Sequence, residues 1–483
     1  MAEVLGMNIG IRLLEIQIKN IKNVCHGSID FESKKQIEKG LFDLKTSDLI
    51  GIYGPNGSSK TAMINSFAIL KSIIISRDLK ENDNRINHFD EKEIYDLIKK
   101  DENEASIELT YFVDQIDKML CIYEVIIGKN DTTKTAFIKR ERLSYKTYSE
   151  KEEKWNSKTK LVDVDFYNEN LSDFIQPSTL ISIFKKNDKT ILNALQRLVG
   201  STSSSNSSFI FSETFISVLE KIEELKKSAL ALKKLKFYAI HNMHVYDNKE
   251  ISQIAAIDAI PFFYSSESNS EVNTLVGKFT IFGESVLSNE LKPLINDYFK
   301  EIDIVINKII PSMHVEIVDL GNVILDNGME GFRCEVVSIR NDLKIPLRLE
   351  SDGIKKIISL ISSMVDVFNN KSSILVVDEL DSGVFEYLLG ELLKAFKDEA
   401  KGQLLFTSHN LRALEVIKDS IVFSSLDENE RYVTYPRISK TENLRSQYLR
   451  KLFLDSDNKY AEHIDLYDIY RSFIKAGELT HHE

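Results

Sequence analysis

The chain is poor in the residues that mark disordered or cross-linked proteins. Its 483 residues include 7 prolines, 19 glycines and 3 cysteines, and 43% of them are hydrophobic. This composition excludes a linker-rich or disordered chain and predicts a structured globular protein. Cys25, Cys121 and Cys334 form no CxxC pair, which argues against a disulfide framework and a cysteine zinc site. We therefore expect a reducing, cytoplasmic location.

Long apolar runs and an excess of positive charge are also missing. No run approaches the roughly 20 apolar residues that a membrane helix needs, and the first residues lack the regions of a signal peptide. The formal net charge of -12 argues against a surface that binds nucleic acid merely by being basic, although a local positive groove can still exist. We expect no membrane partner. At 483 residues, we expect a main domain with a large insertion, or two adjoining domains.

A glycine-containing loop between a predicted strand and a predicted helix is the first functional signal. Residues 49–53 are typical of a buried strand, and residues 61–76 are apolar enough for a helix packed on a sheet. The backbone N–H groups of such a loop can surround phosphate oxygens at a helix N-terminus, where the helix dipole also favours anions. The loop reads Gly54, Pro55, Asn56, Gly57, Ser58, Ser59, Lys60, Thr61.

This loop has the form of a P-loop for ATP. Lys60 is expected to reach the β- and γ-phosphates, and the Thr61 hydroxyl to bind Mg²⁺. The general pattern has glycine directly before the lysine, where this chain has Ser59. If the loop needs a positive φ there, serine is strained, and we expect the strain to affect geometry and turnover more than ATP binding. A protein that binds ATP without turnover therefore stays an alternative.

Two further predicted strands end in residues suited to the same chemistry. Residues 373–377 lead into Asp378 and Glu379. Asp378 is expected to hold Mg²⁺, and Glu379 to orient and deprotonate the attacking water. Residues 404–407 lead to His409, which can sense the γ-phosphate. Two neighbouring acids also occur as helix caps, and a lone histidine after a strand is usually structural. The prediction of an ATP site therefore rests on the occurrence of these residues together with the glycine loop.

Ser351 and Gly353 precede an apolar helical stretch, where a Ser-x-Gly sequence also fits a plain helix N-cap. The order of P-loop, Ser351-Asp-Gly353, strand ending in Asp378 and histidine switch resembles the ABC ATPase heads of chromosome-maintenance and recombination-repair proteins. More closely, residues 14–22, 350–353 and 443–449 resemble the bacterial family of abortive-infection and overcoming-lysogenization-defect ATPases.

The resemblance implies an α/β fold, a P-loop NTPase of ABC-ATPase head type with an antiparallel β subdomain and a mainly helical insertion. It implies a head-to-head dimer or higher homo-oligomer, in which Ser351 and Gly353 bind the γ-phosphate held by the partner subunit. The segment Asp381-Ser-Gly383 would communicate between the two sites. The Q-loop glutamine of such ATPases is not identified; residues 85–90 are where it is expected.

Relatives of the overcoming-lysogenization-defect type carry a C-terminal Toprim nuclease. The sequence after His409 is too short for one, and Asp455-Ser-Asp457 is expected to be an exposed acidic turn. We therefore expect a nuclease or toxin on a separate chain. His241 and His244 lack a third ligand in the sequence, so no metal site is expected there.

Four segments are expected along the chain. They are 1–150 with the P-loop and a β meander over 107–113, 119–127 and 136–145; 151–312, a mainly helical insertion; 313–440 with the Ser351-Asp-Gly353 signature, the Walker B strand that ends at Asp378 and the His409 switch; and 441–483, a C-terminal helical tail. Within the insertion, the Ser-rich residues 200–208 are expected to form a flexible link or exposed loop, and the apolar stripe from Phe215 to Leu232 is expected to form a helical arm packed on the insertion's own core.

The leading functional hypothesis is an ATP-driven sensor and scaffold in anti-phage defence that controls a separate effector such as a Toprim-like nuclease. A phage protein is the candidate trigger. The alternative is a DNA-repair or chromosome-maintenance ATPase that acts on DNA directly through lysines of the arm. Glutamates interleaved with those lysines favour a solvated face instead.

Overall fold

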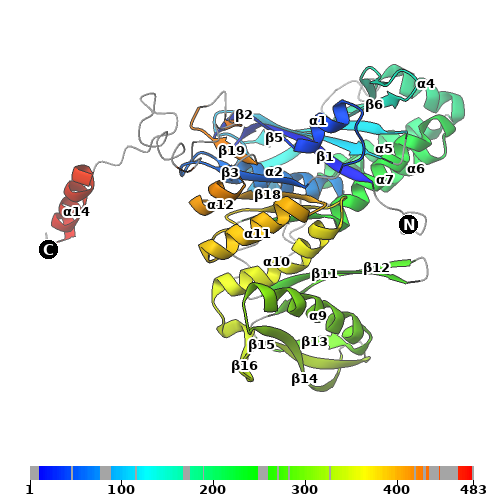
Figure 1. The fold of residues 1–483 in the computed structure, drawn as a ribbon. Helices are drawn as coiled ribbons and strands as arrows, with labels where there is room; N and C mark the ends of the chain where they lie inside the picture. The colour runs from blue at the N-terminus through cyan, green and yellow to red at the C-terminus, as the bar shows by residue number, and fades with distance from the viewer. Residues whose placement is uncertain are drawn as a thin grey trace.

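The computed structural model arranges the chain in layers (Figure 1). An antiparallel sheet lies at the top of the view, a mainly parallel sheet lies below it with α2 between them, and α10 to α12 cover the far face of the parallel sheet. A further lobe follows beneath α10. The structure describes residues 10–44, 47–76, 89–114, 117–166, 175–188, 190–247, 259–268, 271–280, 283–325, 328–417, 420–427, 431–434, 445 and 466–480.

The antiparallel sheet confirms the predicted meander and extends it. Its strand order is β2-β1-β4-β5-β6-β8-β9, with β7 paired to β6. The sheet continues to Gln176, past the predicted boundary at residue 150, so the start of the predicted helical insertion is strand. The strands are β1 (Ile11–Ile21), β2 (Val24–Asp30), β4 (Glu104–Val113), β5 (Met119–Asn130), β6 (Thr135–Ser149), β7 (Lys154–Trp155), β8 (Thr159–Asp165) and β9 (Ile175–Gln176).

The second sheet has the order β10-β17-β18-β3-β19-β20 and is parallel except at β20. Its central strands are mostly apolar because both faces of the sheet are buried. On β3, Ile50 and Ile52 pack toward α2, while Leu49 and Tyr53 pack on the opposite face. The strands are β3 (Asp48–Tyr53), β10 (Met243–Tyr246), β17 (Ile374–Val377), β18 (Gln403–Thr407), β19 (Ile421–Ser424) and β20 (Tyr432–Val433).

Helices cover both faces of the parallel sheet, which together with the P-loop confirms the predicted α/β P-loop fold with an antiparallel subdomain. Helix α2 (Lys60–Ile74) is buried along nearly its whole length between the two sheets. On the other face lie α10 (Asp352–Asn369), α11 (Glu386–Glu399) and α12 (Leu411–Val416). Two short helices flank the antiparallel sheet: α1 (Glu32–Glu38) and α3 (Glu91–Leu97).

Strands β13 to β16, which lie between residues 285 and 346, form a separate sheet. They pair in the order β13-β15-β14, with β16 on β15, and pack on α9. Ile357, Ile358 and Ile361 of α10 share this third core. The elements are β11 (Ala259–Ser268), β12 (Glu271–Thr280), β13 (Ser285–Ser288), η2 (Asn289–Leu291), α9 (Lys292–Ile309), β14 (His314–Ile324), β15 (Glu330–Arg340), β16 (Leu343–Pro346) and η3 (Leu347–Leu349).

The predicted Ser-rich loop is wrong over most of its length, because α5 continues to Ser205. The hydroxyls that suggested a loop bind carbonyls one turn back: Thr202 donates to Leu198 at 2.9 Å and Ser204 to Gly200 at 2.8 Å. The predicted arm is two packed helices, but its apolar stripe lies in the main core, together with α2 and the antiparallel sheet, and not in a core of the insertion's own. The helices are α4 (Ser178–Asn187), α5 (Thr190–Ser205), α6 (Glu213–Glu220), η1 (Glu223–Leu225) and α7 (Lys226–His241).

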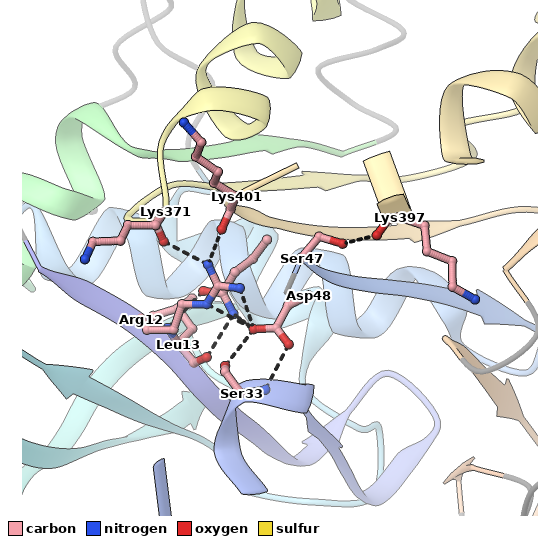
Figure 2. Close-up of polar contacts among 9 residues, drawn as sticks. Arg12, Leu13, Ser33, Ser47, Asp48, Lys371, Lys397 and Lys401 are labelled. Atoms are coloured by element: carbon pink, nitrogen blue, oxygen red, sulfur yellow. Dashed lines mark hydrogen bonds and ion pairs between the residues drawn. The ribbon is translucent and has the colours of Figure 1, made fainter. Parts of the chain in front are cut away.

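A buried ion pair fastens the two sheets together (Figure 2). Arg12 of β1 and Asp48 of β3 are 3% and 1% exposed, with Nη2 and Oδ2 2.9 Å apart. Arg12 also donates to the carbonyls of Lys371 and Lys401, at 2.9 and 2.7 Å. Ser33 donates to Asp48 through its backbone N–H and its hydroxyl. The pair therefore fixes β1 against the starts of the parallel strands.

Several predicted features lie outside the described residues: Asp455-Ser-Asp457, residues 85–88 of the Q-loop search segment, and all of 443–449 except Arg445. Of the predicted C-terminal tail, α14 (Leu466–Thr480) is helical. Over the part of the chain that is described, no helix combines the length and the apolar character needed to cross a bilayer.

Candidate functional site

The parallel sheet brings the predicted site residues to one edge. Strands β3, β17 and β18 run parallel, so the loops after their carboxyl ends meet. These loops and the β1–β2 turn enclose a cavity of about 310 Å³. It is lined by Lys22, Asn23, Asn56, Gly57, Ser59, Lys60, Thr61, Asp378, Glu379 and His409.

The P-loop conformation explains its sequence. Gly57 has φ 77°, a left-handed conformation that glycine adopts without steric cost. At Gly54 a Cβ atom would lie 2.2 Å from Ser424 Oγ, so no larger residue fits without movement. Ser59 has φ 67° and ψ 33°, the positive φ that makes a serine here strained. Ser58 turns inward, where its hydroxyl lies 2.5 Å from Ser424 Oγ.

Lys60 begins α2 and is 8% exposed. Its ammonium donates to the carbonyl oxygens of Gly54 and Pro55 at 2.9 and 3.1 Å. The ammonium therefore lies over the loop, at the end of a helix whose first backbone N–H groups favour an anion. Thr61 follows on the first turn and also lines the cavity.

Asp378 and Glu379 are held by Thr407 on the neighbouring strand. The Thr407 hydroxyl donates to Asp378 Oδ1 and accepts the backbone N–H of Glu379 at 2.7 Å. Glu379 has φ 48°, an uncommon conformation for a glutamate. Asp378 is 1% exposed, and its Oδ2 has no hydrogen-bond partner among the described residues.

The unpartnered oxygen provides a test of whether the site suits a cation. A buried carboxylate oxygen without a donor is costly, and a hard cation is the ligand that satisfies it best. The Thr61 hydroxyl shares the cavity with Asp378, so the chemistry of the donor set fits Mg²⁺.

His409 follows β18 and is exposed, with its side chain at the cavity. Its backbone N–H donates to Asp381 Oδ2 at 3.0 Å, which fixes the turn that carries the imidazole. The histidine and the carboxylates therefore come from adjacent loops that bind each other directly.

Lys22 and Asn23 also line the cavity, although neither was among the site residues predicted from the sequence. They form the turn between β1 and β2, and Lys22 has φ 53°. Burial lowers the pKa of Lys22, against the opposing effect of Asp378 and Asp247. Asn23 Nδ2 donates to the Gly57 carbonyl at 2.6 Å. Lys22 is the last residue of the segment 14–22 that carries the family resemblance, and Asn23 follows it directly.

Ser351 and Gly353 do not line the cavity of their own chain. Ser351 is the N-cap of α10, and its hydroxyl accepts the Ile354 N–H at 3.4 Å. Gly353 packs against Gly383, where a Cβ atom would lie 1.7 Å from the Gly383 carbonyl oxygen.

Comparison with known proteins assigns the family. The family model described as "AAA domain, putative AbiEii toxin, Type IV TA system" matches residues 49–415, which include every residue of the loops described above except the β1–β2 turn and β19. A search of curated proteins finds no match.

Solved structures with low identity also match. The Smc head domain of Pyrococcus furiosus, bound to the C-terminal domain of ScpA, is 14% identical, with 88% of this chain and 96% of that chain covered at a TM-score of 0.38. The SMC head domain of Thermotoga maritima is 13% identical, with 88% and 100% covered at 0.36. The recombination mediator RecF bound to ATP is 11% identical, with 88% and 99% covered at 0.35.

Proposed function

This chain belongs to the AAA-domain family whose model it matches over residues 49–415, and on that premise we propose that it binds ATP with Mg²⁺ and hydrolyses it. The observation that carries the proposal is the convergence of the P-loop, Asp378, Glu379 and His409 on one cavity. These groups come from three loops, those after β3, β17 and β18, and no structural role of one group accounts for the presence of the others.

Each side chain has a specific task in this proposal. The loop N–H groups and Lys60 bind the phosphates, and Glu379 orients a water molecule and accepts its proton. His409 binds the γ-phosphate from the loop after β18, which lies between the other two. Asp378 and Thr61 would hold Mg²⁺, which supplies neutralisation of phosphate charge when bound.

The site is completed by a second copy of the chain. Ser351 is exposed at the start of α10, and Gly353 directly follows Asp352 on the first helical turn. The N-terminus of a helix is suited to bind an anion. Ser351 and Gly353 do not line the cavity of their own chain, so the anion that we assign to the start of α10 is the γ-phosphate bound by a second subunit. We propose a head-to-head dimer with two such composite sites.

Hydrolysis is tested on the purified full-length protein by phosphate release and by ATP binding. Glu379→Gln should retain ATP affinity and lose about 100-fold or more in turnover, because it removes the base. Lys60→Met should weaken ATP binding. Glu399→Gln, an exposed position at the end of α11, is the matched control and should behave as wild type. Undiminished turnover in Glu379→Gln would refute the assignment.

We further propose that the protein is the sensor and scaffold of an abortive-infection system, close to the overcoming-lysogenization-defect type, that controls a separate effector. The support is the family's printed association with toxin systems, together with the finding that the described residues contain no cluster of three or more His, Cys, Asp or Glu side chains of the kind that a metal-dependent nuclease would use. Co-purification should recover a nuclease-like or toxic neighbour, and phage plating should depend on Glu379. A protein that assembles with nothing and protects no cells excludes this role.

The family description favours a second candidate, in which this chain is itself the toxic component. Expression of the chain alone separates the two: growth arrest supports the toxin, and harmless expression supports the scaffold. Direct action on DNA has less support. Of the five arm lysines expected to contact DNA in that case, Lys234 is 1% exposed and the other four are ion-paired, as Lys226–Glu223, Lys227–Asp117, Lys233–Glu220 and Lys236–Glu213.

A further inference from the structure

A buried lysine connects the start of α10 to the loop that carries Glu379. Lys356 lies one turn into α10 and is 5% exposed. Its ammonium donates to the carbonyl oxygen of Glu379 and, at 3.4 Å, to that of Ser382. Both acceptors are backbone atoms, so the contact fixes the course of the loop instead of neutralising one side chain.

The same two segments also meet through glycines. Gly353 on the first turn of α10 approaches Gly383 so closely that a Cβ atom at Gly353 would lie 1.7 Å from the Gly383 carbonyl oxygen, and one at Gly383 would lie 3.0 Å from the Gly353 Cα atom. Together with Lys356, this contact holds the loop from Glu379 to Gly383 against the helix at both of its ends. The turn that faces a partner subunit is therefore joined directly to the loop of the chain's own cavity.

Glu379 needs such support because its backbone is strained. A non-glycine residue at φ 48° persists only where the surroundings enforce it. Thr407 holds its N–H, and Lys356 holds its carbonyl. The peptide units on both sides of the Glu379 Cα atom are thus fixed by other segments, which aims the side chain.

The charge environment agrees with a role at the site. Burial lowers the pKa of Lys356 to about 8, while Asp381, Glu379 and Asp378 act in the opposite direction. A buried ammonium is expensive to desolvate, and an apolar residue would suit the helix better. The cation is therefore best explained by the carbonyls and carboxylates that surround it.

We propose that Lys356 is a positioning residue that sets the orientation of Glu379 and makes it depend on the first turn of α10, where the partner's nucleotide would bind. The inference rests on the proposed ATPase function. In this arrangement, closure of two subunits on Ser351 and Gly353 is transmitted to Glu379 of the same chain through one helical turn.

The test compares wild type, Lys356→Met and Lys356→Gln as full-length proteins. Lys356→Met should lower kcat by about 10- to 100-fold, since small displacements of a catalytic group have effects of this size. Its KM and its affinity for ATP should change less than about threefold. Lys356→Gln keeps an amide N–H that can donate to the Glu379 carbonyl, so its kcat should lie between those of wild type and Lys356→Met. Lys234→Met, which removes a lysine that is 1% exposed on α7, is the control for loss of a buried lysine.

Hydrogen exchange without nucleotide gives a readout independent of turnover. The amides of Leu380, Ser382 and Val384, which are hydrogen-bonded in the loop, should exchange faster in Lys356→Met. An active wild type with unchanged kcat and exchange in Lys356→Met overturns this inference alone. An inactive wild type overturns the proposed function and this inference with it. Equal loss of ATP binding and kcat in both Lys356 variants overturns the positioning role.

Discussion

Replacing Arg12 by methionine should be among the most destabilising single changes in this chain. Removal of one partner of a buried ion pair typically costs about 3–5 kcal/mol, because the other charge stays buried. Asp48 would keep three donors: the Ser33 N–H at 2.9 Å, the Ser33 hydroxyl at 2.6 Å and Gln403 Nε2 at 3.1 Å. The charge term should therefore lie near the lower limit, at about 3 kcal/mol.

Two backbone carbonyls add to that cost. Lys371 and Lys401 each lose the donor that Arg12 provides, at roughly 0.5–1 kcal/mol apiece. The total is about 4–5 kcal/mol. With a urea slope of about 2–3 kcal/mol/M, the unfolding midpoint of the region should fall by about 1.3–2.5 M.

The protein contains its own probe for this region. Trp155 is the single tryptophan, and its Nε1–H donates at 3.0 Å to the carbonyl of Ile37 on α1, the helix that also carries Ser33. Urea unfolding followed by Trp155 fluorescence therefore reports on the segment docked to Asp48. Lys226→Met, which breaks an exposed pair with 54% and 84% exposed side chains, should shift stability by less than about 0.5 kcal/mol.

A double-mutant cycle separates the charge from the packing. Arg12→Met combined with Asp48→Asn should be less destabilised than the sum of the single variants, because no unpaired charge remains. An Arg12→Met variant within about 1 kcal/mol of wild type would refute the reasoning, since it would mean that Asp48 is solvated or paired in another way.

The remaining predictions concern Asp163 on the antiparallel sheet, and Ser59 and Lys22, which line the cavity. Burial raises the pKa of Asp163, but hydrogen bonds from Arg140 and Lys160 outweigh this effect and lower the pKa to about 2. Asp163→Asn should therefore lower the free energy of unfolding by about 2 kcal/mol near neutral pH. The urea midpoints of wild type and Asp163→Asn should converge as the pH falls from about 4 toward 2. Ser59→Gly should stabilise by up to about 1 kcal/mol by relieving the positive φ, whereas Ser59→Ala should not; thermal midpoints decide, and equal midpoints would contradict the strain. Lys22→Met should weaken ATP binding about tenfold in calorimetry by removing a cation from the cavity, while Lys19→Met, on the exposed side of β1, should not.

The sequence was sufficient for features set by local pattern. The P-loop, the carboxylates after β17 and the histidine after β18 lie on adjacent loops because parallel strands end at one edge, a consequence that follows from apolar runs followed by polar residues. The meander was likewise recoverable, because its alternation reflects one buried face.

Features set by distant contacts were not recoverable. Strand β10 is only Met243–Tyr246 and joins the parallel sheet far from its neighbours in sequence, so no local pattern marks it as part of the ATPase core. Ser201, Ser204 and Ser205 lie in α5 with their hydroxyls donating to carbonyls of the same helix, although the composition of this segment favours a loop. Lys22 enters the cavity through a strained turn, whose geometry depends on the Leu97 carbonyl that binds its N–H at 2.6 Å.

The position of β10 limits how the chain can be divided. Its four residues register with Ile374 to Val377 of β17 and lie at the edge of the parallel sheet. A truncation that removes residues 151–312 as one module would also remove β10 and leave β17 as an uncovered, wholly apolar edge, the kind that pairs with other chains and aggregates. A shortened protein that keeps residues 243–246 tethered to the sheet should remain monodisperse where the simple deletion does not.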